Sequence, residues 1–512
     1  EEYTSFLGAG CYKHQVPAIC DEINSRGEFL TAYCGDTYSD HGKMQAIFEY
    51  TSMMGELLDT DVVSYTTYDG GQAVASSLRM AVRAVREKGM AGKVILVPKT
   101  MNPEIYSQVV QYCRNVAEVR KIAYEPETGL MDLEELKEQL AKKNVAAVFF
   151  ENPTYLGNFE TRGEEIAKLA HDAGAYCVVQ TEVAALGIME SPVNQGADIV
   201  CGDIQPLGMH IQFGGGQAGF IACNQNMDLV EQFPTYMYGI TETEKEDTYG
   251  WGRAMNYRSS HGSRENAKEY FGTETGLWAI TAGVYLASMG PQGMYELGET
   301  IIQNAAYLED ILDEIPKVRA KRFENAKFQE FVIDFNRTGK TVEEINKELL
   351  KENIFGGKDL SHDFPELGQC ALYCVSEITT LEEMEHLRNA LKRIVMGYYK
   401  TNRDFHEARW DEPIIMKLGN PGERGVLVPK ADEKVTKATG TVETLLPENL
   451  IRKKAPKLPE MSQMQVLRHY MRLSQETIGT DFNIDIGLGT CTMKYSPKIH
   501  EQLVRSEKLS EV

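Results

Sequence analysis

The chain lacks several features that would direct it to a membrane or to nucleic acid. It contains no apolar run of about 18 residues, the length that a membrane-spanning helix needs. Its first residues, Glu1-Glu2-Tyr3, have neither the basic nor the apolar region of a signal peptide. Bases are few: 53 Lys and Arg face 75 Asp and Glu, a net charge of −22. Because nucleic-acid binding depends on clusters of Lys and Arg, we expect a soluble cytoplasmic protein with no membrane or nucleic-acid partner.

Metal-binding motifs are also missing. The 10 cysteines are scattered along the chain, which favours reduced thiols over a disulfide framework. Cys370 and Cys374 are spaced like two metal ligands, but they lie in an apolar run and no second pair follows. His14, His41 and His210 share no motif. We therefore predict no metal site.

Helical and strand-like segments alternate over the first part of the chain. Short apolar runs at 93–98, 145–150 and 175–179 predict buried parallel strands, separated by short connections from segments with helical periodicity. This alternation indicates a large doubly wound α/β domain, which we place at residues 1–240 with the N-terminal segment. The expected helices are 44–58, 72–86, 103–115, 133–142 and 166–173.

A second unit follows an aperiodic polar stretch at 241–261. Its pattern predicts a small α+β domain within residues 241–400, and Thr341 and Thr380 are expected to cap two of its helices. The expected helices are 277–289, 294–312, 341–352 and 381–395, and the expected strands are 328–334 and 370–375.

Residues 411–459 are rich in proline and charge and have little periodicity, and a helix is predicted at 463–475. We expect an extended arm held by apolar anchors, although a flexible tether is the alternative. The pattern Cys11-x5-Pro17-x-Ile19 recurs as Cys491-x5-Pro497-x-Ile499. This weak internal repeat indicates that a second, similar half begins within residues 401–512. The absence of an initial Met and of a C-terminal stop in the pattern indicates a fragment. The expected anchors are Ile414, Ile415, Val426, Leu427, Leu445 and Leu446.

One segment looks like the cofactor-lysine region of a pyridoxal-phosphate enzyme without its lysine. In residues 198–219, an apolar run precedes the glycines 214–216, and Gln205-Pro206 stand where His-Lys is expected. No lysine occurs between Lys168 and Lys245. A Schiff base needs a primary amine, so the segment predicts the non-catalytic half of a two-half enzyme, with no catalytic residue in it.

Three other segments carry weaker signals. Residues 68–73, Tyr-Asp-Gly-Gly-Gln-Ala, lie at the predicted N-terminus of a helix and could bind a phosphate. Glycine at the start of a helix is, however, more often required for steric reasons alone. Glu182 follows a strand, where a carboxylate could pair with a pyridinium nitrogen, but a solvated turn acid is the favoured interpretation. The loop 488–497 crowds hydroxyl, thiol, amine and phenol groups and could line a pocket.

Several motifs resemble the P-protein of the glycine cleavage system, glycine dehydrogenase (decarboxylating), in its two-subunit form. Residues 1 to about 396 are similar to subunit 1 and the rest to the start of subunit 2, which suggests a fusion. The motifs are Phe6-Leu-Gly-Ala-Gly10, Arg26-Gly-Glu-Phe29, Gln45-Ala-Ile-Phe-Glu-Tyr50, Tyr68-Asp-Gly70, Gly290-Pro-Gln-Gly293, Pro421-Gly-Glu-Arg-Gly425, Leu445-Leu-Pro447, Arg468-His-Tyr-Met-Arg-Leu-Ser474 and 488–497.

The resemblance implies a fold-type I pyridoxal-phosphate-dependent transferase-like large domain, a smaller α+β domain and an extended C-terminal arm. It implies decarboxylation of glycine and transfer of the aminomethyl group to the lipoyl group of the H-protein. The cofactor would be bound mainly by the subunit-2-like half, or by a second protomer, with Thr490, Cys491, Thr492 and Lys494 near it.

Two segments depart from the family's usual pattern, Cys34–His41 and Ser263–Thr273. These departures bear on glycine specificity. The alternatives are therefore a divergent pyridoxal-phosphate decarboxylase or lyase for another small amino acid, and a non-catalytic scaffold.

Overall fold

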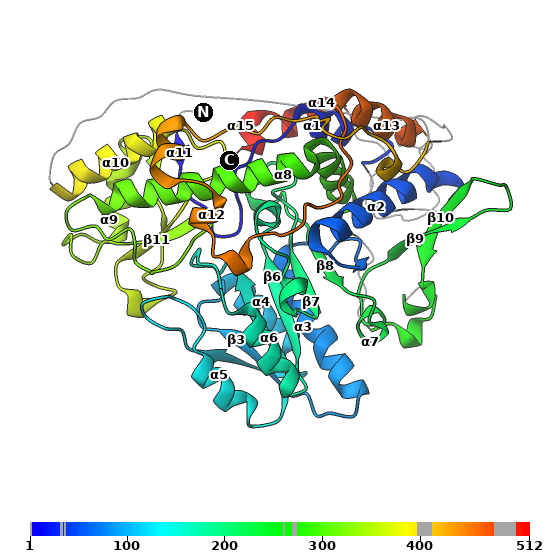
Figure 1. The fold of residues 1–512 in the computed structure, drawn as a ribbon, viewed down its shortest axis with the longest axis horizontal. Helices are drawn as coiled ribbons and strands as arrows, with labels where there is room; N and C mark the ends of the chain where they lie inside the picture. The colour runs from blue at the N-terminus through cyan, green and yellow to red at the C-terminus, as the bar shows by residue number, and fades with distance from the viewer. Residues whose placement is uncertain are drawn as a thin grey trace.

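The computed structural model describes residues 3–30, 34, 37–259, 262–268, 274–396, 412–475 and 498–511. Its centre is a seven-stranded sheet in the order β2-β8-β7-β6-β5-β3-β4 (Figure 1). Strand β8 runs antiparallel to both of its neighbours, and the pairs from β7 to β4 are parallel. The strands are β2 Val62–Val63, β3 Val94–Pro98, β4 Glu118–Ile122, β5 Val145–Asn152, β6 Tyr176–Thr181, β7 Ile199–Asp203 and β8 Gly219–Cys223.

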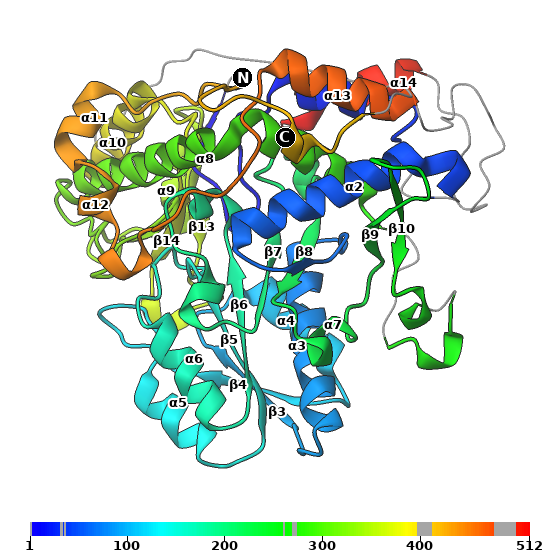
Figure 2. The same ribbon diagram turned by 45° about the vertical axis from the view of Figure 1, so that its right-hand side comes forward.

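Both faces of this sheet are covered. Alternate residues of one strand enter different cores: Val148 and Phe150 of β5 pack in one cluster, and Phe149 packs in the other with helix α3. Burial on both sides explains why these strands read as continuous apolar runs. Helices α3 Gly70–Glu87 and α4 Pro103–Cys113 contribute to one core, and α2 Thr37–Leu58, α5 Leu133–Leu140 and α6 Gly163–Asp172 to the other (Figure 2).

The small domain contains a three-stranded sheet in the order β11-β14-β13. Thr341 and Glu344 form a capping box at the start of α9, as the sequence predicts. The N-terminal strand β1, Thr4–Ser5, pairs in parallel with β12, Ile354–Phe355, so the chain starts against this domain. The other elements are β11 Glu330–Asp334, α9 Val342–Leu350, β13 Lys358–Asp359, β14 Cys370–Cys374 and α10 Leu381–Met396.

One prediction for residues 237–313 is wrong. The stretch 241–261, predicted to be aperiodic, includes the end of β9 Met237–Glu242 and the whole of β10 Tyr249–Ala254, which pair as a β-hairpin. Glycines at 239, 250 and 252 interrupt its apolar alternation and hide the strands from pattern reading. The two helices predicted at 277–289 and 294–312 are confirmed: they make up α8 Gly276–Asp313 and are separated by a kink, where Gly290 adopts φ 60 before Pro291.

Residues 412–475, here called the arm, lie along α8 and end over α2 (Figures 1 and 2). Of the predicted anchors, Ile415, Val426 and Leu446 are buried, and Ile414 and Leu445 pack against the core. Leu427 is 70% exposed and is not an anchor, because Val428, at 6%, turns inward instead. The arm contains η7 Ile415–Lys417, α11 Glu433–Thr439, α12 Val442–Leu445, η8 Glu448–Leu450 and α13 Gln463–Gln475.

The last described helices, α14 Lys498–Val504 and α15 Glu507–Ser510, lie beside α1, Ala18–Asn24 (Figure 1). Arg505 donates hydrogen bonds to the backbone carbonyls of Asp21 and Asn24 at the end of α1. A cation at this position also interacts favourably with the helix dipole. Helices α1 and α14, which begin directly after Pro17 and Pro497 of the internal repeat, therefore lie side by side.

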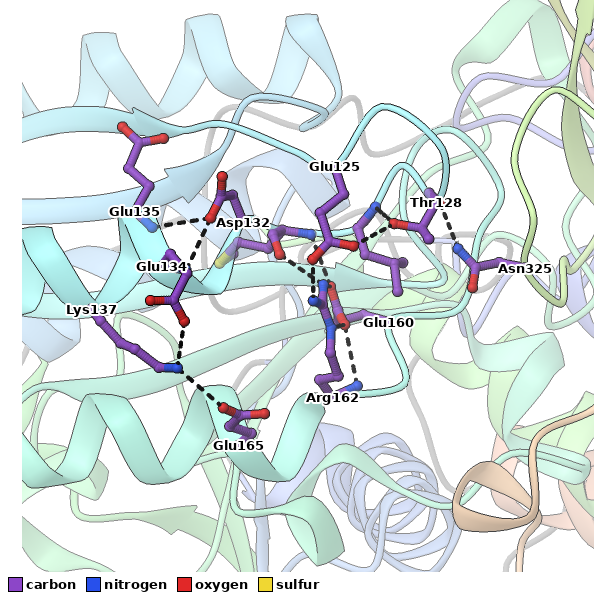
Figure 3. Close-up of polar contacts among 12 residues, drawn as sticks. Glu125, Thr128, Asp132, Glu134, Glu135, Lys137, Glu160, Arg162, Glu165 and Asn325 are labelled. Carbon is purple, nitrogen blue, oxygen red and sulfur yellow. Dashed lines mark hydrogen bonds and ion pairs between the residues drawn. The ribbon is translucent and has the colours of Figure 1, made fainter.

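A polar network fixes the loop between β4 and α5 (Figure 3). Arg162 donates to Glu160 Oε1 at 3.0 Å, to Glu125 Oε1 at 2.7 Å and to the carbonyl of Met131 at 2.7 Å. Asn325 donates to the carbonyl of Thr128 at 2.5 Å, which connects the same loop to residues that precede β11. The planar guanidinium satisfies several acceptors at once, as a lysine could not.

Within the described ranges, no helix combines the length and the hydropathy that crossing a bilayer requires.

Candidate functional site

A cavity of about 370 Å³ opens where strands β5, β6 and β7 end. In open α/β sheets this edge is the usual ligand site, because the connections diverge there. Glu151, Glu182 and Asp203 stand at the ends of the three strands, and Glu330 of β11 reaches the cavity from the small domain. The N-terminal segment completes the wall with Tyr12, whose hydroxyl donates to Glu330 at 2.8 Å.

The N-terminus of α3 also faces this cavity, as the segment 68–73 predicts. Two of its N-terminal amides are already paired with carboxylates. Gly70 N–H donates to Asp203 Oδ2 at 2.8 Å, and Gln72 N–H donates to Asp69 Oδ1 at 2.6 Å. A phosphate at this point would meet two carboxylates in place of free donors, so the phosphate-cup hypothesis does not fit these residues.

Gln205, the first residue of the Gln205-Pro206 pair found where His-Lys is expected, has a structural role. Its side chain is 1% exposed and bonds both ways with the backbone of Tyr12, accepting at 3.0 Å and donating at 2.8 Å. A third bond runs to the carbonyl of Met209 at 3.0 Å. The amide therefore joins the loop after β7 to the N-terminal segment. Among the described residues that line the cavity there is no Lys, Arg or His.

The cavity carboxyl groups have strongly perturbed acidity. Burial raises the pKa of Glu151 to about 8 and the pKa values of Glu182, Asp203 and Glu330 to about 7. The charge of Glu182 adds to the rise at Glu330, and backbone amides and, at Glu330, the Tyr12 hydroxyl partly oppose it. The interpretation of Glu182 as a solvated turn acid is wrong, because its side chain lies in the cavity wall.

Pyridoxal phosphate needs an amine for its aldehyde, donors for its phosphate and an acid for its ring nitrogen. Of these, only the acid is present here, as Glu182. The lysine position holds Pro206, which has no amine, and Asp203 and Asp69 accept from the amides of Gly70 and Gln72 at the start of α3. The described residues of this cavity therefore do not fit the cofactor.

The three histidines and the pair Cys370 and Cys374 singled out in the sequence do not line this cavity. Thr490, Cys491, Thr492 and Lys494 lie outside the described residues. His14 pairs with Glu377 at 2.8 Å, His41 contacts the ring of Trp251, and His210 lies between Asp21 and Glu511. Cys370 and Cys374 are buried in β14, and the described part of the chain has no group of three or more His, Cys, Asp or Glu that could hold a metal ion.

Sequence reasoning missed Tyr12, Glu151 and Glu330. Glu330 lies about 150 residues beyond the strand ends that it faces, on a strand of the other domain. No local pattern connects these segments. The one available signal is the acid directly after the apolar run 145–150, which marks the end of a buried parallel strand.

The fold and the family are shown by comparison with known proteins. The family model "Glycine cleavage system P-protein" matches residues 1–391. Two relatives are each named "Probable glycine dehydrogenase (decarboxylating) subunit 1", one from Pyrococcus abyssi and one from Staphylothermus marinus. Both are 36% identical, over 77% of this chain and 85% of the first relative, and over 76% and 82% for the second.

A crystal structure of the glycine decarboxylase (P-protein) of the glycine cleavage system, in inhibitor-bound form, matches with a TM-score of 0.69 at 30% identity. The match covers 77% of this chain and 85% of that one. A sphingosine-1-phosphate lyase of Burkholderia pseudomallei, at 14% identity and a TM-score of 0.56, shares the fold alone. These matches confirm the fold-type I transferase-like architecture. The chain belongs to the glycine cleavage system P-protein family.

Proposed function

We propose that this chain supplies the subunit-1-like half of a glycine decarboxylase. The complete enzyme decarboxylates glycine and transfers the aminomethyl group to the lipoyl group of the H-protein. The family match and the cavity chemistry support this division of labour. The observation that carries it is the Gln205-Pro206 pair. Pro206, which has no amine, stands at the lysine position, and Gln205 before it is engaged with the backbone of Tyr12 and Met209.

The cofactor site belongs, on this proposal, to a subunit-2-like half that begins within residues 401–512. Thr490, Cys491, Thr492 and Lys494 would lie close to the bound pyridoxal phosphate. Two observations favour the fusion. The arm is anchored on the first half through buried residues such as Ile415 and Leu446. In the internal repeat, α14 begins directly after Pro497, as α1 begins directly after Pro17.

The partners follow from the same proposal. They are glycine, the lipoylated H-protein and a subunit-2-like half of the same chain or of a second protomer, and the proposed compartment is the cytoplasm. Residues 1–240 and 241–400 would form a scaffold that holds the catalytic half and offers a face to the H-protein. No nucleic-acid partner is proposed, in line with the net charge of −22.

Isotope exchange tests the reaction. Full-length, cofactor-loaded protein should exchange labelled bicarbonate into the carboxyl group of glycine only when lipoylated H-protein is present. Unlipoylated H-protein is the matched control. An active protein that shows no such exchange, but releases carbon dioxide from another small amino acid, would support the divergent decarboxylase instead.

A further inference from the structure

The cavity at the ends of β5, β6 and β7 has a one-sided charge. Its wall includes several acidic side chains, and none of the described lining residues is basic. The neutral polar side chains around them are mostly amides, among them Gln108, Gln180 and Gln217. The acids are Asp69, Glu104, Glu151, Glu182, Asp203 and Glu330.

Two acceptors in this wall lack a matching donor within the described residues. Glu182 accepts one backbone bond on Oε1, from Ala184 at 3.2 Å, and its other oxygen has no donor. The Oε1 atom of Gln180 is sealed from solvent and has no hydrogen-bond partner. The Glu182 side chain is partly exposed to the cavity, whereas a sealed acceptor such as the Gln180 oxygen is normally satisfied, and leaving it unpaired costs about 1–3 kcal/mol.

Two further carboxylates are oriented by hydrogen bonds. Glu151 accepts from the amides of Asn102 and Tyr155, each at 3.3 Å. Glu330 accepts from Ala9 N–H at 2.6 Å and from the Tyr12 hydroxyl. Donors from three separate segments thus orient the side chains of Glu151 and Glu330 in the cavity wall. A cavity of about 370 Å³ is within the size range of small-molecule sites.

The chemistry of this wall selects among ligands. An anion would face the carboxylates with the amides of Gly70 and Gln72 already bonded. The described acids do not form a cluster that could hold a metal ion. A ligand that carries N–H donors and a positive charge would satisfy the acceptors and offset the charge together. We infer that this cavity binds a small organic cation with primary ammonium groups, with Glu182 and Glu330 as its principal partners.

The acidity of the cavity supports this inference. The raised pKa values show that the carboxyl groups ionise with difficulty while no cation is near. A bound ammonium group would lower these pKa values and release protons. Binding near pH 7 should therefore have an enthalpy that depends on the ionisation enthalpy of the buffer.

Calorimetry with 1,4-diaminobutane tests the inference on the full chain. We expect saturable binding with proton release at pH 7. The neutral analogue 1,4-butanediol and the dianion succinate should not bind. Glu182→Gln and Glu330→Gln should each weaken binding about tenfold, because each removes one charge-assisted hydrogen bond. Glu164→Gln, at an exposed site on α6, is the matched control and should bind as the original protein does.

Circular dichroism of both variants checks that they fold, and either one suffices if the other does not. The inference is overturned if the diamine does not bind, if it binds equally to both folded Gln variants, or if magnesium ions alone bind. These outcomes do not depend on decarboxylase activity, so they are separate from the test of the proposed function.

Discussion

The backbone amide of Gly70 donates a hydrogen bond of 2.8 Å to the carboxylate of Asp203. This contact joins the N-terminus of α3 to the end of β7, the two places that would hold a phosphate and precede a lysine in a cofactor site. Asp69 accepts from the amide of Gln72, so two amides at this helix end are bonded to carboxylates of the chain itself. Residues 1–391 therefore have the fold of a cofactor enzyme and carry a different set of charges in their cavity.

The cavity acids predict how stability depends on pH. Their pKa values in the folded state, about 7 for Glu182 and about 8 for Glu151, exceed the ordinary value of 4.5. The folded state then binds more protons, so the free energy of unfolding should fall as pH rises from about 4.5 to 8. Glu182→Gln should remove one of these costs and raise the unfolding free energy at pH 8 by about 2 kcal/mol.

Urea unfolding at pH 4 and pH 8 measures this effect. The variant should gain stability at pH 8 and little at pH 4, where the carboxyl group is largely protonated in both the folded and the unfolded protein. Equal stability changes at the two pH values would show that Glu182 does not titrate as described.

A buried histidine fastens the arm. The ring of His469 is fully buried and contacts Glu49 of α2 through Nε2 and Glu412 of the arm through Nδ1, each at 2.8 Å. Replacing His469 with Ala leaves two buried carboxylates without their shared cation, which should cost about 3 kcal/mol. Limited proteolysis between Arg424 and Lys457 should therefore become faster. The exposed neighbour provides a control, since Arg468→Gln should leave the cleavage rate unchanged.

The protonation of His469 also makes the anchoring of the arm depend on pH. The carboxylates of Glu49 and Glu412 raise the pKa of His469 from 6.5 to about 9, against the effect of burial. This stabilisation is complete below pH 6.5 and is lost as pH rises through about 9. Cleavage of the arm should accelerate between pH 8 and 10 in the original protein. A rate that stays flat across this range would contradict the assignment.

Arg162 stabilises the loop between β4 and α5 (Figure 3). Arg162→Lys keeps the charge but cannot reach Glu160, Glu125 and the Met131 carbonyl together, so we expect a loss of about 1–3 kcal/mol. Chemical denaturation measures it. The exposed pair of Lys168 with Asp172 is the comparison, and Lys168→Gln should change stability by less than about 0.5 kcal/mol. Equal losses would mean that the network in Figure 3 adds nothing beyond a surface ion pair.

Local sequence rules predicted the regular elements well and the site poorly. Helix α13 has the predicted bounds, and Thr341 caps α9, because capping and apolar periodicity act within a few residues. The hairpin β9–β10 was not predicted, because its glycines interrupt the alternation of apolar and polar residues that marks a strand. Leu427 was predicted to be buried, but Val428 is buried in its place. An extended segment turns alternate side chains inward, and the sequence does not specify which of two adjacent apolar residues faces the core.

The cavity could be predicted only in part. The missing lysine was visible at Gln205-Pro206, because it depends on one residue type in one segment. The placement of Glu330 and Tyr12 opposite Glu182 depends on how the two domains and the N-terminal segment pack, which no local pattern encodes. The partly buried position of Glu182 has the same origin.

On the proposed division between the two halves, residues 1–396 do not hold the cofactor covalently. Full-length protein would be incubated with pyridoxal phosphate, reduced with borohydride, digested and mapped by mass spectrometry, with unreduced protein as the control. We predict no phosphopyridoxyl-lysine at stoichiometric level among residues 1–396, and any such label should lie at Lys494 or beyond. A stoichiometric label on a lysine within residues 1–396 would contradict the account.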